Sequence, residues 1–259
     1  MSALLELRSV GISFGGLRAV DQLSFSVAEG QIVGLIGPNG AGKTTVFNLI
    51  TGVYRPTNGE ILWQGSRITG LRPHRVAALG IRRTFQTIRL FAEMSVFENV
   101  RAGCHLGVRQ HWWQGVLQLP AQRREEAELA ERTHAVLRRL QLETHANDLA
   151  VSLPYGLQRR VELARTLVGE PKLVILDEPA AGLNDAESEA LNETILGVRA
   201  SGITVLLVEH DMNVVMKVSD HIVVLNFGRL IAEGDAAAIR DNSAVIEAYL
   251  GREDEEAAA

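Results

Sequence analysis

The chain has 259 residues, of which 46% are hydrophobic and 22% are charged, with a formal net charge of −5. This composition is that of an ordinary globular protein, and the negative charge argues against a nucleic-acid binder, which usually has a basic face. The single cysteine excludes an intrachain disulfide, and we find neither a signal peptide nor an apolar run of the roughly 18 residues that a membrane helix needs.

The first predicted elements are strands in which apolar and polar residues alternate. They are "LLELRSVGISF" (residues 4–14), "LSFSVAEG" (23–30) and "GEILWQGSRI" (59–68). Alternation with a period of two is typical of strands with one buried face. We expect these segments to form a small antiparallel β layer.

A second kind of segment is apolar on both faces and ends in polar residues. There are four: "QIVGLIG" (31–37), "LVILDE" (173–178), "TVLLVEH" (204–210) and "HIVVLNFG" (221–228). Continuous runs of Val, Ile and Leu with helical patterns between them indicate buried parallel strands joined by crossovers. The predicted helices cover residues 43–53, 185–199 and 211–218, and Asp185 and Asp211 stand at N-cap positions.

Residues 87–152, approximately, interrupt this α/β pattern. Ser95 and Glu98 in "SVFENV" have the spacing of a capping box. "REEAELAERTHAVLRRLQL" (124–142) carries its apolar residues on one side of a helix. We therefore expect a helical subdomain inserted into a core made of residues 1–86 and 153–259.

The segment "GPNGAGKTT" (37–45) matches the phosphate-binding pattern G-x-x-x-x-G-K-[ST], and it lies between a buried strand and a helix as that pattern requires. Its glycines allow backbone N–H groups to turn toward phosphate oxygens, and the helix N-terminus adds positive potential. Lys43 can reach the β- and γ-phosphates, and the Thr44 hydroxyl can bind Mg²⁺. A glycine-rich turn that binds nothing is the alternative.

Asp177 and Glu178 follow the buried strand of "LVILDEP", at the edge where open α/β sheets bind ligands. Asp177 suits Mg²⁺, directly or through water, and Glu178 could polarise an attacking water. Taken alone, this pair fits a helix cap or a solvated charge pair equally well. The presence of a phosphate-binding loop in the same chain favours the catalytic interpretation.

Two further polar residues lie at element ends. His210 ends another buried run and could donate a hydrogen bond to a γ-phosphate, although a lone histidine is more often structural. Gln86 lies where the core passes into the helical subdomain, where it could cap a turn or contact Mg²⁺ or the attacking water.

The segment "LPYGLQRRVELAR" (153–165) predicts a second helix start suited to an anion, because Gly156 has no side chain to keep a phosphate away. We expect this helix to open at Leu157. Leu157, Val161, Ala164 and Leu167 predict a buried face of that helix. Burial of that face does not account for Gly156.

Together these motifs resemble the ATP-binding subunits of ABC transporters over nearly the whole chain. The segments "FGGLRAV", "LPYGLQRR", "DEPAAGLN", "VEHDM" and "VIEAYLG" are most similar to the branch that imports branched-chain amino acids. The resemblance implies an α/β fold, with a P-loop NTPase (RecA-like) core, an antiparallel β subdomain and an inserted helical subdomain. It also implies ATP and Mg²⁺ as cofactors.

The resemblance assigns roles to individual residues. Phe14 stacks on adenine and Val20 packs near the ribose. Glu178 is the general base, His210 senses the γ-phosphate, and Gln86 and Asp177 complete the Mg²⁺ shell with Thr44. The remaining nucleotide contacts are assigned to Gly37, Asn39, Gly40, Gly42, Lys43, Thr44 and Thr45, and, on the segment that faces a second subunit, to Leu153, Tyr155, Gly156 and Gln158.

This chain departs from the commonest family pattern at two positions. Pro154 stands where the signature serine contacts the γ-phosphate, and Asn184 replaces the usual aspartate of the segment "AGLN". Backbone N–H groups around Gly156 must therefore carry more of the phosphate contact.

The resemblance implies that two ATP-binding subunits, identical or different, enclose two ATP molecules, and that residues 153–158 of each chain contact the ATP bound by the other. It also implies two transmembrane permease subunits, an extracytoplasmic solute-binding protein that acts indirectly, no nucleic acid, and a peripheral location on the cytoplasmic face of the membrane. Trp112 and Trp113 are then either core residues or part of an exposed patch that meets a permease.

Three other interpretations remain open at this point. The solute could be urea, an amide or another amino acid, because other chains select it. A soluble ABC ATPase that acts on nucleic acid or ribosomes would usually carry two ATPase units, long coiled coils or zinc modules. A small P-loop kinase would need a lid that binds an acceptor and would not need residues 153–158.

Overall fold

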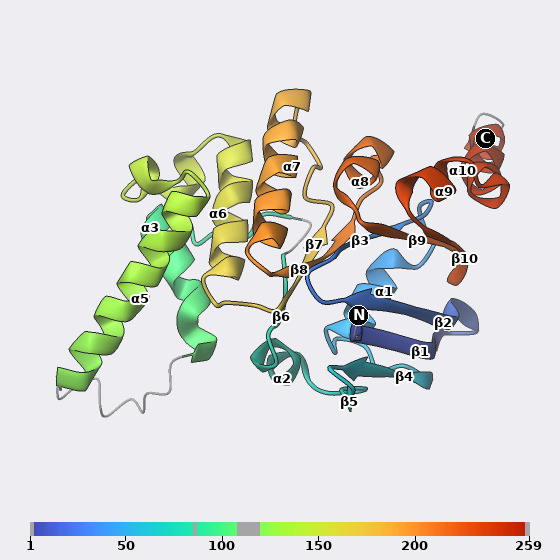
Figure 1. Ribbon diagram of the computed structural model, residues 1–259, viewed down its shortest axis with the longest axis horizontal. Coiled ribbons are helices and arrows are strands. Elements are labelled where there is room, and N and C mark those ends of the chain that lie inside the picture. Colours follow the sequence, from blue (N-terminus) through green and yellow to red (C-terminus); the bar gives the residue numbers. More distant parts are fainter. Residues whose placement is uncertain (1–2, 85–86, 108–119, 257–259) are drawn as a thin grey trace. The chain divides into compact units, whose positions relative to one another are not determined.

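The computed structural model describes residues 3–84, 87–107 and 120–256 (Figure 1). The chain divides into two compact units: Met1–Arg83 with Lys172–Ala259, and Thr84–Pro171. The second unit is longer than the helical subdomain that we predicted, because the helix at Tyr155–Leu167 packs with the helices at Val96–Arg101 and Pro120–Arg139.

The first unit contains the predicted antiparallel layer, a four-stranded sheet in the order β2-β1-β4-β5. Its strands are β1 (Ala3–Phe14), β2 (Leu17–Ala28), β4 (Asn58–Trp63) and β5 (Ser66–Arg67). The segment predicted as one strand at 59–68 is thus a short hairpin, since Gly65 at φ 75° turns the chain between β4 and β5.

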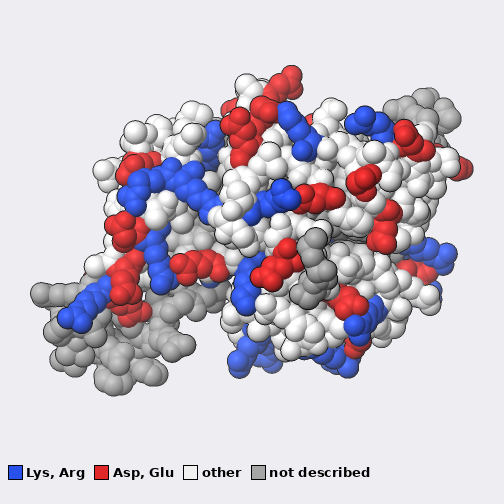
Figure 2. Space-filling model, in the orientation of Figure 1, with Lys and Arg blue, Asp and Glu red and all other residues white. Residues whose placement is uncertain are grey.

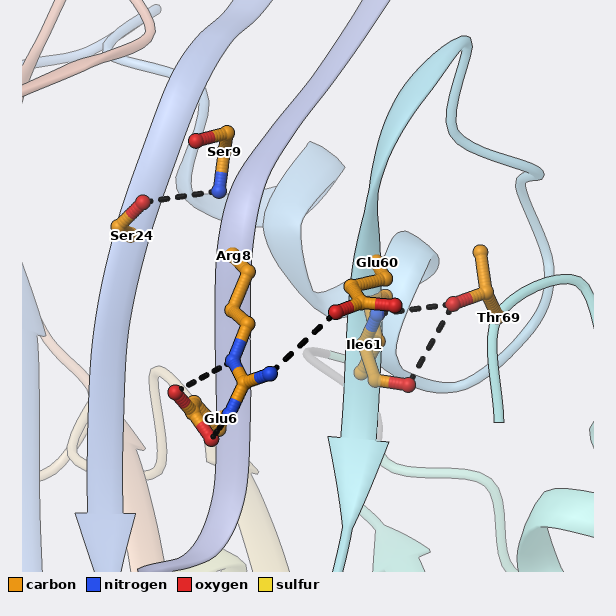
Figure 3. A network of polar contacts seen from close by, with 7 residues as sticks. All are labelled: Glu6, Arg8, Ser9, Ser24, Glu60, Ile61 and Thr69. Atoms are coloured by element: carbon orange, nitrogen blue, oxygen red, sulfur yellow. Dashed lines mark hydrogen bonds and ion pairs between the residues drawn. The ribbon is translucent and has the colours of Figure 1, made fainter. Parts of the chain in front are cut away.

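Polar contacts on the exposed face link the strands of this sheet (Figure 3). Arg8 on β1 donates to Glu6, at 2.7 and 2.9 Å, and to Glu60 on β4, at 3.4 Å. The Ser9 N–H donates to the Ser24 hydroxyl on β2 at 2.8 Å. Exposed pairs of this kind contribute little to stability, but they match the register in which the strands pair.

The second sheet of this unit has six strands in the order β10-β9-β3-β8-β7-β6. The four predicted buried strands are confirmed as β3 (Ile32–Ile36), β7 (Leu173–Asp177), β8 (Thr204–Val208) and β9 (His221–Asn226). The sequence did not predict the two edge strands, β6 (Ile81–Arg83) and β10 (Arg229–Gly234). β6 is short and rich in arginine, and β10, which pairs antiparallel with β9, is not uniformly apolar.

The helices of this unit are α1 (Lys43–Ile50), α2 (Pro73–Ala78), α7 (Asp185–Ala200), α8 (Met212–Val218), α9 (Ala236–Arg240) and α10 (Ser243–Glu256). α1 ends three residues earlier than predicted, because Gly52 takes a left-handed conformation at φ 76°. The N-cap of α7 is Asn184 and not Asp185: its side chain accepts from the Glu187 N–H at 3.0 Å. The predicted N-cap at Asp211 is confirmed.

One hydrophobic core joins the two sheets of this unit through α1. Phe47 of α1 is completely buried between β1 and β2 residues, such as Leu7 and Leu23, and parallel-strand residues, such as Leu35. A second cluster on Ile36, Ile222 and Val224 is covered by α8, α9 and α10. Burial on both faces explains why the parallel strands are uniformly apolar. The same packing holds in place the strand ends, which carry the polar residues.

The second unit contains α3 (Val96–Arg101), α5 (Pro120–Arg139) and α6 (Tyr155–Leu167), with short 3₁₀ segments at Ala102–Gly107, Glu143–His145 and Ala150–Ser152. α3 packs against both α5 and α6. The capping box at Ser95 and Glu98 is confirmed. None of the helices in the described residues has both the length and the apolar character needed to cross a membrane.

Candidate active site

Three neighbouring parallel strands bring the predicted catalytic residues to one edge of the six-stranded sheet. Leu35 of β3 lies opposite Val208 of β8, which in turn lies opposite Asp177 of β7. Adjacent strands are about 4.8 Å apart. Three segments therefore begin side by side: the phosphate-binding loop, residues 177–178 and residues 209–210. The prediction of parallel strands requires this arrangement.

The loop between β3 and α1 has a backbone that only glycine fits. Gly37 has φ 149°, and a Cβ there would lie 2.1 Å from the Leu225 carbonyl oxygen. Gly42 has φ 102° and is the N-cap of α1, with no side chain capping the helix. The first N–H groups of α1 thus lack a side-chain acceptor, which leaves a helix start suited to an anion.

The predicted phosphate contacts lie on this loop and on the first turn of α1. Asn39, Gly40 and Thr44 are exposed, and Thr45 is half-buried. The Lys43 ammonium is buried and donates to the carbonyls of Gly37, at 2.5 Å, and Pro38, at 3.1 Å. These bonds hold the cation over the loop.

Replacing Lys43 by alanine is expected to weaken binding of a nucleoside triphosphate at least tenfold, because a charge-assisted hydrogen bond is worth about 1.5–3 kcal/mol. Isothermal titration calorimetry with ATP measures this directly. The control is thermal unfolding of the variant without nucleotide. It shows whether the fold is destabilised, since the Gly37 and Pro38 carbonyls also lose a hydrogen-bond donor. An unchanged ATP affinity would exclude Lys43 from the phosphate site.

Asp177 is 4% exposed and is already paired. Arg83 of β6 donates to its carboxylate at 2.6 Å and to the Asn48 side chain on α1 at 2.7 Å. Asn48 is one helical turn after Thr44, so both lie on one face of α1. This arrangement places Asp177 near the helix face that carries the Thr44 hydroxyl, and the sequence did not predict the role of Arg83.

Thr44 and Asp177 offer a hydroxyl and a carboxylate, the hard oxygen ligands that Mg²⁺ takes in proteins. No group of three or more His, Cys, Asp or Glu side chains in the described residues could hold a metal ion. The two oxygens therefore fit a magnesium ion that draws its other ligands from a nucleotide and water.

Glu178 has a left-handed backbone, with φ 46°, in which side chains other than glycine are rare. Its N–H donates to the Val208 carbonyl at 2.9 Å. On the next strand, His210 is exposed, with its Nδ1 3.7 Å from the Glu209 carboxylate. A carboxylate and an imidazole thus follow the ends of the adjacent strands β7 and β8.

Glu209 is completely buried, and the sequence analysis did not single it out. Its carboxylate accepts from the Ala180 N–H at 2.7 Å and from the His210 N–H at 3.3 Å. Burial raises the pKa of this carboxyl, and the two N–H donors oppose that rise. The signal in the sequence that could have indicated Glu209 is its charge at the end of the apolar run "TVLLVEH".

Phe14 stands at the turn between β1 and β2 and is 43% exposed. Its ring meets the edge of Tyr54 with centroids 5.1 Å apart, so an open aromatic face remains for stacking.

Val20 is completely buried instead of lining an open site. A Cβ on Gly42 would lie 3.7 Å from a Val20 methyl group, so Val20 supports the phosphate loop from below.

In the second unit, residues 153–158 form the start of α6. The helix begins at Tyr155 with Pro154 as an N-cap that provides no side-chain hydrogen bond. The predicted opening at Leu157 is wrong, because the Leu157 N–H already donates to the Pro154 carbonyl at 3.0 Å. The N–H groups without a helical acceptor are those before it, on Tyr155 and Gly156.

The side chains around this helix start are fixed from within the unit. The Gln158 amide donates to the carbonyls of Leu153, at 2.8 Å, and Val151, at 3.1 Å. Arg159 donates to the Tyr155 hydroxyl at 3.0 Å. Gln158 therefore shapes the turn before the helix, and Leu153 is buried. Of the predicted buried face, Val161, Ala164 and Leu167 are buried and Leu157 is half-buried.

Three residues from the sequence predictions, Gln86, Trp112 and Trp113, lie outside the described residues. Their predicted roles remain predictions.

Comparison with sequence families gives two matches. Residues 20–181 match the family described as "ABC transporter", and residues 229–255 match "Branched-chain amino acid ATP-binding cassette transporter". Among curated proteins, the chain is 47% identical to the high-affinity branched-chain amino acid transport ATP-binding protein BraF of Pseudomonas aeruginosa, over 96% of this chain and 98% of that protein. It is 46% identical to LivG of Escherichia coli K12, which has the same description and coverage.

Solved structures give the same result. An ATP-binding cassette of an ABC transporter in its ADP conformation superposes with a TM-score of 0.85 at 30% identity, covering 97% of this chain and all of that one. A dimeric post-hydrolysis cassette bound to ADP and Pi superposes with a TM-score of 0.74 at 25% identity, covering 90% of this chain and 98% of that one.

Proposed function

Because this chain belongs to the ABC transporter family, as an ATP-binding subunit, we propose that it hydrolyses ATP to power the import of branched-chain amino acids. The single observation that carries the ATPase role is that the strand end leading into the Lys43 loop and the strand end carrying Asp177 and Glu178 lie at one edge of one sheet. The proposed solute rests on the match over residues 229–255 and on the names of the relatives.

The proposed reaction is attack of water on the γ-phosphate, in which a P–O bond to the water oxygen forms, the P–O bond to ADP breaks, and ADP and inorganic phosphate leave. Glu178 accepts the proton of that water, and Lys43 with the N–H groups of α1 stabilises charge on the phosphate oxygens. His210 donates to the γ-phosphate. Thr44, Asp177 and Gln86 would hold Mg²⁺, which would supply positive charge to neutralise the phosphates.

We further propose that the working unit has two ATP-binding subunits, identical or different, joined to two permease subunits. In it, the open N–H groups of Tyr155 and Gly156 face the ATP that is bound by the other subunit. Support comes from the uncapped start of α6, which suits an anion, and from the dimeric cassette among the structural relatives. A solute-binding protein acts through the permease.

An apolar patch in the second unit supports the permease contact. It consists of Phe91, Met94, Leu149 and Val151, which are exposed by 50%, 39%, 51% and 44%. Met94 and Leu149 lie close together, since the Ala150 N–H donates to the Met94 carbonyl at 3.2 Å. Exposed apolar side chains that gather in this way mark contact sites.

Co-expression with the permease subunits is expected to move the chain into the membrane fraction, and Leu149→Glu is expected to prevent this. A buried charge without a partner costs far more than an exposed one. Quantitative blotting of membrane and supernatant fractions measures the effect. Leu196→Glu, at a residue 38% exposed on α7 of the other unit, is the matched control. Equal membrane recovery of the Leu149 variant and wild type would remove this patch from the interface.

Purification of the tagged chain from native membranes tests the assignment as a whole. Mass spectrometry should identify permease subunits in the purified complex. The same subunits, reconstituted, distinguish branched-chain amino acids from urea, an amide or another amino acid as solute.

A soluble ATPase that acts on nucleic acid is the second candidate, and one observation bears on it. Figure 2 shows Lys and Arg side chains interleaved with Asp and Glu across the visible face. Proteins that bind phosphate backbones usually gather their basic residues on one face, so this face favours the transport role.

A further inference from the structure

Glu209 is a completely buried carboxylate that the proposed reaction does not use. It follows Val208 at the end of β8 and precedes His210. Its Oε1 accepts from the Ala180 N–H at 2.7 Å, and its Oε2 accepts from the His210 N–H at 3.3 Å. A buried ionisable group is costly unless it is well bonded, so these contacts call for a role.

The strand end that Glu209 faces carries a strained residue. Glu178 has φ 46°, a conformation that disfavours side chains and persists only where neighbouring contacts enforce it. Its own N–H donates to the Val208 carbonyl at 2.9 Å. Two residues later, the Ala180 N–H donates to Glu209. The turn at 178–180 is therefore held at both ends by consecutive residues of one neighbouring strand end.

The two bonds differ in what supports them. The Val208 carbonyl is part of the backbone and stays whatever side chain is present. The Glu209 bond depends on a side chain long enough to reach Ala180 from the next strand. The second bond to this turn thus depends on the length of the side chain at position 209.

We propose that Glu209 is a positioning residue that holds Glu178 in the strained conformation from which it activates water. This inference rests on the proposed function, in which Glu178 is the general base. Among the described residues, Glu209 accepts hydrogen bonds from Ala180, in the turn after Glu178, and from His210, and not from residues 37–45. Its loss should therefore reduce turnover and leave ATP affinity unchanged.

Two variants separate the effect of the side-chain length at position 209 from the effect of its charge. Glu209→Gln keeps the length and an oxygen that can accept from Ala180, but it removes the charge. Glu209→Asp keeps the charge, but its carboxylate is about 1.5 Å shorter and falls short of Ala180. If Glu209 acts by position, ATP turnover of the complete transporter should fall about tenfold in the aspartate variant. In the glutamine variant it should stay within about threefold of wild type.

Three measurements accompany turnover. ATP affinity by calorimetry should stay within about twofold of wild type in both variants. Hydrogen exchange at the Ala180 amide should be faster in the aspartate variant than in the glutamine variant. In a Glu178→Gln background, Glu209→Asp should cause no additional loss of turnover, because the residue it positions is already inactive.

The inference is overturned if the glutamine variant loses more turnover than the aspartate variant, or if ATP affinity falls in parallel with turnover. It is also overturned if the double variant, Glu178→Gln with Glu209→Asp, loses turnover by the product of the two single losses. Failure of the proposed function looks different: Glu178→Gln alone would then hydrolyse ATP at the wild-type rate. Thermal unfolding of each variant identifies any that is misfolded. If the aspartate variant is misfolded, the glutamine variant, with the smallest change in shape, still tests the inference, because a loss of turnover greater than about threefold would overturn it.

Discussion

Replacing Glu178 by glutamine is expected to lower ATP turnover by about 10²–10⁴-fold, the usual contribution of a positioned general base. The amide keeps the shape of the side chain and the strained backbone at φ 46°, but it cannot take a proton from water. The residue before it, Asp177, is buried and paired with Arg83, and so is not available as a substitute base. Turnover is measured in the complex with permease subunits, because we propose that a second ATP-binding subunit completes the site.

ATP affinity is the control for this variant. Lys43 and the open N–H groups belong to the start of α1, a different segment from Glu178, so ATP should still bind with wild-type affinity. Loss of binding together with turnover would point to a collapsed site. Hydrolysis at close to the wild-type rate would show that Glu178 is not the base.

The second large effect is expected from Gly156→Asp. Gly156 lies in the first turn of α6, where its N–H has no helical acceptor and no side chain caps the helix. An aspartate there places a negative charge where an ATP phosphate should approach. The variant chain should bind ATP normally when alone, because its own phosphate loop is on the other unit.

In a complex with two distinguishable ATP-binding subunits, one of them carrying Gly156→Asp, hydrolysis should fall about a hundredfold at one site only, as when a transition-state donor is lost. That site is the one whose phosphate loop belongs to the unmutated subunit. Gly156→Ala, which adds a methyl group and no charge, is the matched control. Loss confined to the variant's own phosphate loop would show that residues 153–158 act within one chain.

The sequence predicted the central sheet and the phosphate loop because both have strong local patterns. Uniformly apolar runs report burial on both faces of a strand, and the glycine spacing of residues 37–45 reports a backbone that only glycine can adopt. Since parallel strands end at one edge, the proximity of Asp177, Glu178 and His210 to that loop also followed from the pattern.

The residues that were missed depend on contacts distant in sequence. Arg83 pairs with Asp177 across 94 positions, and Glu209 reaches Ala180 across 29. Neither contact leaves a periodic signal, and a single charge in or beside a strand is easily taken for a solvated one. Val20 was placed near a ribose by resemblance, but the close approach of β2 to Gly42 buries it.

The boundary of the inserted unit was also set by packing. The sequence-based prediction assigns residues 153–171 to the core, whereas the structure groups them with the inserted unit. Their helix α6 buries Val161 and Ala164 and packs against α3 and α5. Hydrophobic periodicity shows that a helix has a buried face but not which partner covers that face.

ATP-dependent uptake of radiolabelled leucine into proteoliposomes tests the central claim most directly. The vesicles contain the complex purified through this chain, with ATP enclosed on the inner side, where this chain lies, and with the solute-binding protein and leucine outside. Leucine should accumulate only with ATP and Mg²⁺, and accumulation should stop when this chain carries Glu178→Gln. Accumulation of leucine at the same rate without ATP, or with the Glu178 variant, would contradict the claim that ATP hydrolysis on this chain powers import.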